Sequence, residues 1–237
     1  RAHVACASGI ADVVCDIAGM EKGQHRIIPD IIVDEALEEL AKAELIHPWF
    51  PRKHGGDEWK VDPPVILGVG RLTRQKDFQT LIKAFAKTRE KMECRLLILG
   101  EGEKRSELER LAESLNVLEH VQMPGFVDNP WRYMRAADLF VLSSLWEGVS
   151  HILVQAQALG TPIVSTDCPA GQREVLLDGA AGRLVPVGDV EKMTEAILKS
   201  ISGDSETEKK VQAGLDAKER FTQGPVIEAW DSFVRAI

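Results

Sequence analysis

Apolar runs of strand length alternate with helix-length amphipathic segments between residues 65 and 201. The apolar runs are residues 65–69, 95–99, 121–123, 139–142, 163–165 and 183–185. The intervening segments predict helices, because their apolar residues recur at helical spacing, over residues 77–91, 106–115, 130–136, 151–159 and 190–201. The central runs are apolar on both faces. The pattern therefore predicts an α/β fold with a doubly wound parallel, Rossmann-like sheet that is covered by helices on each side.

The first part of the chain shows a weaker version of this pattern. Residues 3–7, 8–18 and 26–28 predict a strand, a helix and a second strand. A strand pair of this kind is marginal without neighbouring strands, so we expect it to add to another surface. An acidic helix is predicted over residues 34–45, and a Pro- and Gly-rich stretch typical of a linker continues to Pro64.

The last part of the chain predicts two helices. Residues 205–220 are charged, Gly224-Pro225 predicts a break, and an amphipathic helix follows. The apolar face of that helix needs a partner surface. We expect an exposed apolar patch that drives self-association, formed by Trp49, Phe50, Trp230 and Phe233.

Composition narrows the possible partners. The 237 residues are 44% apolar and carry a formal net charge of −8, with no block of Lys or Arg, so nucleic acid is not an expected partner. The apolar runs are far shorter than the ~20 residues that a membrane-spanning helix needs. No signal peptide is recognised and the chain lacks an initiator Met, so we expect a cytoplasmic fragment of a longer protein.

The metal-binding residue types are scattered. His47 and His54 lie in the Pro- and Gly-rich stretch, which fixes no ligand geometry. Reduced thiols without CxxC spacing are expected at Cys6, Cys15, Cys94 and Cys168. We therefore expect neither a metal nor a cofactor.

The stretch of residues 143–176 is the strongest candidate for a binding site. It predicts a strand end, a turn at Glu147-Gly148, a helix from about His151 and a second strand. Loops at the carboxyl ends of parallel strands are where open α/β sheets bind ligands. Gly148 allows a ligand to approach the backbone, and the helix start presents unpaired N–H groups and a positive dipole end. The expected ligand is an anion or a polyol.

A second candidate is the segment GVGRLTRQKDF at residues 68–78, which follows the first strand of the sheet. Gly70 permits a tight turn, and Arg71 and Lys76 have a spacing that can bracket a diphosphate, the first as a planar fork and the second as a point charge. On spacing alone, a solvated basic turn explains these residues equally well. The segment has too few glycines for a GxGxxG fingerprint, which argues against a nicotinamide cofactor.

Two further strands are followed by turn glycines. Gly100 and Gly102 come after the second strand, where a plain turn explains them better than a ligand does. Gly125 and Phe126 follow the third strand. The aromatic ring of Phe126 can flank a base or cap the core, and the sequence leaves both possibilities open.

Several blocks together resemble the nucleotide-sugar-binding half of retaining GT-B glycosyltransferases of the group 1 family. The blocks are GVGRLTRQKDFQTLIKAF, LLILGEGEKRSELE, the long run from PGFVDNPWRYM to AGQREVL, and GRLVPVGD. The resemblance covers essentially the whole chain. It implies the C-terminal half of a GT-B fold with a helical C-terminal tail.

The resemblance also implies a division of the chain, because the family places its acceptor half before its donor half. Residues 1–34 are expected to be a remnant of the acceptor-side domain and residues 35–63 a linker. Residues 64–204 are expected to bind the nucleotide sugar, and residues 205–237 to form C-terminal helices. An enzyme of the hexosyltransferase type is implied, which is weak or inactive without the rest of its N-terminal domain. A peripheral position at the inner membrane is compatible with the full-length protein.

Site residues are carried over from the family motifs. The resemblance implies that Arg71 and Lys76 bind the donor diphosphate and that Glu147 binds hydroxyl groups of the donor sugar. Donor contacts are implied at Gly70, Gly100, Gly125, Phe126, Gly148, Val149, Ser150, His151 and Gln155. The resemblance implies no metal, because the two cations and the helix terminus stabilise the departing diphosphate. It implies retention of anomeric configuration, with the leaving phosphate accepting the acceptor's proton.

Three positions depart from the family pattern. Gln155 stands where a second Glu accepts the ribose hydroxyls, and an amide offers neutral bonds of ~0.5–1.5 kcal/mol in place of charge-assisted bonds of ~1.5–3 kcal/mol. Residues 149–151 replace a usual Leu-Pro-Asn, and Ala170 and Gln172 replace Ser and Pro. His151 can contact the donor or form an exposed cap.

Two hypotheses follow. The first is the donor-binding domain of a retaining glycosyltransferase that moves a sugar from a nucleoside diphosphate sugar to a glycan or a lipid-linked acceptor. The second is a non-catalytic module that binds nucleotide sugars or serves assembly, in which Gln155 and His151 mark lost catalysis.

Overall fold

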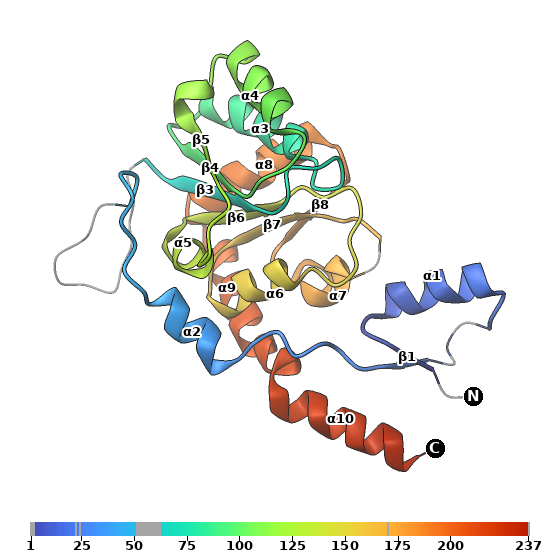
Figure 1. Ribbon diagram of the computed structural model, residues 1–237. Coiled ribbons are helices and arrows are strands. Elements are labelled where there is room, and N and C mark those ends of the chain that lie inside the picture. The colour runs from blue at the N-terminus through green and yellow to red at the C-terminus, as the bar shows by residue number, and fades with distance from the viewer. Residues whose placement is uncertain (1–2, 22, 24, 51–62, 170, 237) are drawn as a thin grey trace.

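The computed structural model describes residues 3–21, 23, 25–50, 63–169 and 171–236. Its centre is a six-stranded parallel sheet with the order β5-β4-β3-β6-β7-β8 (Figure 1). The strands are β3 (Val65–Val69), β4 (Arg95–Leu99), β5 (Val121–Gly125), β6 (Leu139–Leu142), β7 (Ile163–Thr166) and β8 (Arg183–Val185). All six predicted strands and the doubly wound parallel sheet are confirmed.

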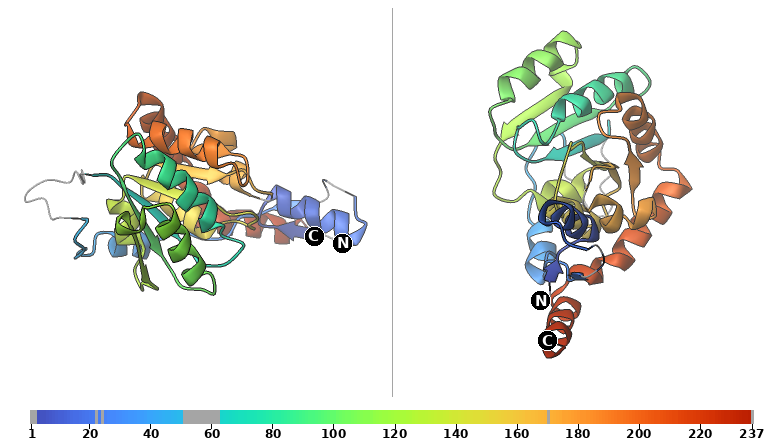
Figure 2. Two further views of the ribbon diagram at one scale, coloured as in Figure 1. Left: turned by 90° about the horizontal axis from the view of Figure 1, so that it is seen from above. Right: turned by 90° about the vertical axis from the view of Figure 1, so that its right-hand side faces the viewer.

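Helices cover both faces of this sheet (Figures 1 and 2). One face is covered by α3 (Phe78–Arg89), α4 (Arg105–Ser114) and α8 (Val190–Ile201). The other is covered by α5 (Trp131–Ala136) and α6 (His151–Ala158), with α9 (Ser205–Ala217) packed outside α6.

Alternate residues of the strands supply two separate apolar cores. Ile66 of β3 belongs to the core under α3 and α8, whereas its neighbours Val65 and Leu67 belong to the core under α5 and α6. This alternation is the physical reason for strands that are apolar on both faces, because each strand fills a core on each side of the sheet.

The N-terminal unit is a separate strand, helix and strand, formed by β1 (His3–Ala5), α1 (Ser8–Ala18) and β2 (His25–Ile27). The two strands pair in parallel and form a two-stranded sheet of their own. The unit lies to one side of the six-stranded sheet (Figures 1 and 2). Helix α1 buries Ala11 and Cys15, but it exposes Val13, Val14 and Ile17 to solvent.

Residues 28–34 connect the N-terminal unit to α2 (Glu35–Ala41). The side chain of Asp34 caps α2 by accepting a hydrogen bond from the N–H of Leu37 at 2.9 Å. The helix ends at Ala41, so the prediction of a helix to residue 45 is wrong in its last turn. The N–H groups of Ile32 and Val33 both donate to the carbonyl oxygen of Phe221, which ties this connection to the C-terminal helices.

Two of the aromatic residues that we expected on an exposed patch lie in the core. Trp49 is 8% exposed and Phe50 is 1% exposed, and His47 packs against both rings. Partial burial and the nearby Arg95 lower the pKa of His47. The prediction of an exposed apolar patch is therefore wrong for Trp49 and Phe50. His54 lies outside the described residues.

The C-terminal helices also correct one prediction. Helix α9 passes into a short 3₁₀ turn, η3 (Lys218–Phe221), and α10 (Gln223–Arg235) follows. The break lies at Thr222, and Gly224-Pro225 falls in the first turn of α10. Proline is tolerated there because a first-turn N–H has no partner within the helix. Trp230 and Phe233 stack edge to face on α10, and Trp230 is 43% exposed, so self-association through these two residues stays a prediction.

Short elements complete the fold. The 3₁₀ turn η1 (Leu118–His120) precedes β5, and α7 (Gln172–Val175) and η2 (Leu177–Gly179) precede β8. Among the described residues, none of the helices combines the length and the apolar character that crossing a bilayer requires.

Candidate active site

The two central strands of the sheet, β3 and β6, lie side by side, and their onward connections lead to opposite edges of the sheet. Such a switch point leaves a crevice at the carboxyl ends of the two strands. The loop after β3 covers residues 70–77, and the loop after β6 covers residues 143–150. The hydroxyl of Ser143 donates to the carbonyl of Lys76 at 2.7 Å, and the N–H of Leu145 donates to the carbonyl of Gln75 at 2.8 Å. The two loops with the predicted site residues therefore meet at one point.

An ion pair lies at this junction. Nζ of Lys76 is 2.5 Å from Oε1 of Glu147, and the two side chains are 16% and 9% exposed. The hydroxyl of Ser144 donates to the same carboxylate oxygen at 2.6 Å. The amide of Gln75 donates to the carbonyl of Trp146 at 2.9 Å and lies 3.5 Å from Oε2 of Glu147. The carboxylate is therefore held from three sides.

Arg71 comes from the same loop as Lys76 but has a different environment. It is exposed, and its guanidinium makes no ion pair or hydrogen bond with the residues that the structure describes. One cation of the predicted pair is thus engaged with a carboxylate, and the other remains available to an anion.

Glycines bring the loops after β3 and β4 into direct contact. A Cβ atom at Gly100, where φ is 141°, would lie 2.0 Å from the carbonyl oxygen of Gly70. A Cβ atom at Gly70 would lie 3.0 Å from Cε of Lys76, so the missing side chain makes room for the lysine stem. The N–H of Gly100 donates to the carbonyl of Gly125 at 2.8 Å, which adds the loop after β5. Backbone packing alone accounts for Gly100, and its contact with a donor stays a prediction.

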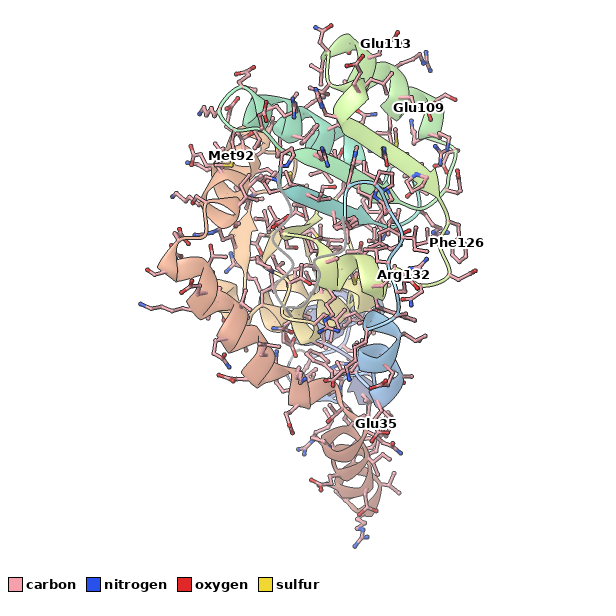
Figure 3. The ribbon with its side chains drawn as sticks, turned by 90° about the vertical axis from the view of Figure 1, so that its left-hand side faces the viewer. Glu35, Met92, Glu109, Glu113, Phe126 and Arg132 are labelled. Carbon is pink, nitrogen blue, oxygen red and sulfur yellow. The ribbon has the colours of Figure 1, made fainter. Side chains whose placement is uncertain are left out.

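The end of β5 presents an aromatic ring to solvent. Phe126 is 75% exposed and lies at the edge of the molecule (Figure 3). Of the two possibilities for this ring, a cap on the core is therefore excluded. Beside it, Arg105 donates to the carbonyl of Met123 at 2.9 Å and to the carboxylate of Glu101 at 2.5 Å. The hydrogen bond from Arg105 holds the pKa of Glu101 below its ordinary value.

The loop before α6 brings the backbone of Gly148, Val149 and Ser150 to the crevice. Helix α6 begins at His151, and its N–H groups point toward the loop as expected for a helix start. The hydroxyl of Ser150 is buried and has no partner in the described part of the chain. His151 is exposed, and its Nε2 lies 3.2 Å from a carboxylate oxygen of Asp30.

The N-terminal unit reaches the same loops. The carboxylate of Glu174, in α7, accepts hydrogen bonds from the N–H of Ser8 at 2.9 Å and from its hydroxyl at 2.8 Å. Ser8 is the first residue of α1, so Glu174 occupies the place of an N-terminal cap. A Cβ atom at Gly148 would lie 3.6 Å from Cδ1 of Ile10. The unit thus closes one side of the crevice.

Three glutamines on α6 and α7 differ in their contacts. Gln155 is half-buried on α6, and its amide has no partner among the described residues. Gln157, two residues on, is buried and donates to the carbonyl of Val175 at 3.1 Å. Gln172 is fully buried, and neither end of its amide has a partner in the part of the chain that the structure describes. Ala170 lies outside the described residues.

Sequence reasoning missed several of these contacts. Gln75 and Ser144 flank predicted residues, but nothing in the sequence indicates that they hold Glu147. Asp30 pairs with His151, 121 positions further along the chain, and Glu174 pairs with Ser8, 166 positions before it. No local sequence pattern indicates contacts over such separations. Among the described residues, His, Cys, Asp and Glu form no group of three or more that could hold a metal ion.

A buried thiol lies close to the ion pair. Burial, with a smaller contribution from Glu147, raises the pKa of Cys168 to about 11. This cysteine is therefore a neutral thiol at physiological pH and carries no charge into the crevice.

Comparison with known proteins places these features in context. Residues 50–219 match the family model described as glycosyl transferases group 1. An uncharacterized glycosyltransferase of Methanocaldococcus jannaschii is 29% identical over 238 residues, which cover 88% of this chain and 57% of the relative. The lipopolysaccharide core biosynthesis glycosyltransferase LpsE of Rhizobium meliloti is 32% identical over 197 residues, which cover 83% of this chain and 53% of the relative.

Solved structures share the fold. The lipopolysaccharide outer core galactosyltransferase WaaB matches with a TM-score of 0.78 at 22% identity, over 99% of this chain and 62% of that one. Anabaena HepE in complex with UDP matches with a TM-score of 0.76 at 18% identity, over 99% of this chain and 63% of that one. These likenesses confirm the GT-B glycosyltransferase fold. The chain spans about half the length of the curated relatives that it matches.

Proposed function

The chain belongs to the glycosyl transferases group 1 family, and we propose that it is the donor-binding part of a retaining, metal-independent glycosyltransferase. The observation that carries the proposal is the meeting of Lys76 and Glu147 at the switch point of the sheet. A cation and a hydrogen-bond acceptor at that place suit a ligand with a diphosphate at one end and hydroxyl groups at the other.

The chemistry follows from the charges around the crevice. In the proposed reaction, the bond between the anomeric carbon and the donor diphosphate breaks, and a bond to an acceptor hydroxyl oxygen forms on the same face. The hydroxyl proton passes to an oxygen of the leaving phosphate. Arg71, Lys76 and the N-terminus of α6 stabilise the negative charge that develops on the diphosphate. Glu147 orients the sugar.

The nucleotide end of the donor has two candidate contacts in the chain. The exposed ring of Phe126 can stack on a base at the end of β5. Gln155 can take the place beside the ribose, where its amide provides one acceptor oxygen. HepE binds UDP in its solved structure, so UDP and its sugars are the first ligands to test.

The acceptor is proposed to bind on the side of the crevice where the N-terminal unit lies. LpsE and WaaB are named for lipopolysaccharide core synthesis, which supports a glycan or a lipid-linked saccharide as acceptor. We place the acceptor surface beside Ser8 of the N-terminal unit and Asp30 of the connection that follows it, where both meet the crevice. In this proposal the remaining acceptor side comes from chain beyond the matched half, and this chain alone transfers little sugar. The full protein works in the cytoplasm, with peripheral contact to the inner membrane.

Titration calorimetry with UDP, GDP and a panel of their sugars tests donor binding directly. We expect the Lys76→Met variant to bind at least about tenfold more weakly, since one charge-assisted contact is worth roughly 1.5–3 kcal/mol. Lys87→Met is the matched control, because Lys87 pairs with Glu191 between α3 and α8, away from the crevice. Absence of binding by all nucleotides at millimolar concentration would contradict the proposal.

A second candidate function rests on the amide at Gln155. If the chain is a non-catalytic module, restoring the second carboxylate with Gln155→Glu tightens nucleotide binding but leaves transfer at zero in the full-length protein. If the chain is part of an active enzyme, the wild-type full-length protein turns over its donor, and Gln155→Glu changes mainly KM. Product analysis on both proteins separates the two functions.

A further inference from the structure

The ion pair at the switch point joins two residues to which the proposed function gives different parts of one ligand. Lys76 is assigned to the diphosphate, and Glu147 is assigned to the sugar. In the structure these side chains bind each other, with Nζ and Oε1 2.5 Å apart. A lysine engaged in this way has less attraction for a phosphate, and a carboxylate engaged in this way has less for a hydroxyl. The two assignments therefore compete.

The two partners are held with different firmness. Glu147 keeps a hydrogen bond from Ser144 at 2.6 Å on the same oxygen that faces the lysine, and Gln75 lies beside its other oxygen. Lys76 reaches the carboxylate with a flexible four-carbon stem that passes over Gly70, where no side chain stands in its way. When the pair opens, Lys76 is therefore the partner that moves, and Glu147 stays in place.

We infer that the Lys76–Glu147 ion pair makes the site discriminate between an intact nucleotide sugar and a bare nucleoside diphosphate. A diphosphate that takes Lys76 leaves Glu147 without its counter-charge in a largely buried position, which opposes binding. A donor sugar compensates this loss with its hydroxyl groups, and a bare diphosphate does not. After transfer, Glu147 recaptures Lys76 and promotes release of the diphosphate product. This inference rests on the proposed function and adds a role in product release.

The sign of one substitution tests the inference. Glu147→Gln removes the competitor of the diphosphate, so pyrophosphate and UDP should bind about fivefold more tightly than to the wild type, as expected for loss of one partly buried ion pair. UDP-glucose should gain less, because the amide is a weaker acceptor for the sugar. Ser144→Ala should act in the opposite direction, with pyrophosphate binding about twofold weaker, because the carboxylate then depends more on Lys76.

Two controls separate the ion pair from a general effect of charge. Glu191→Gln removes one negative charge from a carboxylate that pairs with Lys87, away from the crevice, and should leave the binding of UDP and pyrophosphate unchanged. In a Lys76→Met background, Glu147→Gln should produce no gain. A gain that persists without Lys76 would mean that Glu147 repels the diphosphate directly, and it would overturn the inference.

Calorimetry of all variants with pyrophosphate, UDP, GDP and UDP-glucose distinguishes the possible failures. If the wild type binds UDP and Glu147→Gln binds it equally or more weakly, the inference is overturned and the proposed function stands. If pyrophosphate gains from Glu147→Gln but neither UDP nor GDP binds, the competition for Lys76 stands and the proposed function fails. If none of these ligands binds, both fail. Thermal unfolding of each variant verifies that the fold is intact.

Discussion

The six-stranded sheet and the N-terminal unit are built from the same local pattern and differ in what surrounds it. Strands β3 and β6 are flanked by other strands on both edges and by helices on both faces, and their apolar residues are almost completely buried. Within the described residues, the two strands of the N-terminal unit pair only with each other, and α1 leaves Val13, Val14 and Ile17 exposed. The same strand, helix and strand pattern therefore buries less apolar surface in the N-terminal unit than in the six-stranded sheet.

The difference has a consequence for the crevice. The loops after β3 and β6 follow strands whose core is filled on both sides, which is suitable for holding the backbone of Lys76 and Glu147 in place. The N-terminal unit reaches the same crevice through a polar contact at Ser8 and an apolar contact at Ile10, and the connection that follows the unit adds a polar contact at Asp30. We expect the sheet to hold the site and the unit to open and close against it.

The largest expected difference is between the buried core of the sheet and the exposed face of the N-terminal unit. Phe140→Ala, in the middle of the sheet where the side chain is fully buried, should lower the free energy of unfolding by about 4 kcal/mol, because it leaves a cavity between β6 and the helices. Ile17→Ala, on the exposed face of α1, should lower it by less than about 0.5 kcal/mol. Urea unfolding followed by circular dichroism measures both values. Similar losses would contradict the distinction between the two regions.

The contact between the loops after β3 and β4 gives the next effect. Gly100→Ala places a Cβ atom 2.0 Å from the carbonyl of Gly70, at a positive φ, and should destabilise the protein by about 3 kcal/mol. Gly188→Ala is the matched control, since Gly188 also has a positive φ but no atom lies within 4 Å of its Cβ position. The difference between the two variants measures the cost of the close approach together with that of the less accessible φ at Gly100. Equal losses would show that the close approach adds nothing to the strain of a positive φ.

A smaller effect is expected where the N-terminal unit meets α7. Glu174→Ala removes both hydrogen bonds to Ser8 and should weaken the docking of α1 by about 1 kcal/mol. Amide hydrogen exchange should then accelerate across residues 8–18 and remain unchanged in β3 and β6. Glu208→Ala, on the exposed side of α9, is the control. Acceleration that spreads into the sheet would mean that the two regions unfold together.

The smallest perturbation is chemical modification of the cysteines. The pKa of Cys168 is raised to about 11, mainly by burial, so only about one molecule in a thousand carries the thiolate at pH 8. Cys6, in the N-terminal unit, is less buried, and its pKa is raised mainly by partial burial. With iodoacetamide at pH 8, Cys6 should react first, and Cys168 should react faster only as the pH approaches 11. Mass spectrometry of the modified peptides determines the order.

Periodicity predicted the sheet well because its strands are apolar on both faces. Periodicity did not predict whether residues outside the sheet lie on the surface or in the core, or where the last helix begins. Trp49 and Phe50 read as exposed linker aromatics, but the core beside Tyr133 accepts them. The break before α10 lies at Thr222, because Pro225 fits a first helical turn as well as a break.

For the candidate site, the sequence predicts which loops come together but not the contacts between their side chains. The topology of parallel strands places the loops of Lys76 and Glu147 at adjacent strand ends, and family motifs name both residues. Their ion pair, however, joins positions 71 residues apart, and the hydroxyl of Ser144 has no signature that distinguishes it from Ser143. Such contacts depend on side-chain geometry, which the periodicity of the sequence does not encode.

The interlocking of the loops after β3, β4 and β5 has a consequence for protein engineering. The carbonyl of Gly70 occupies the space where a side chain at Gly100 would lie, and the N–H of Gly100 donates to the carbonyl of Gly125. The backbone conformation of each loop therefore depends on that of its neighbour. A loop grafted alone from a relative would bring a backbone that its neighbours cannot accommodate. The three loops therefore act as one structural unit, and attempts to change ligand preference by loop exchange should transfer them together.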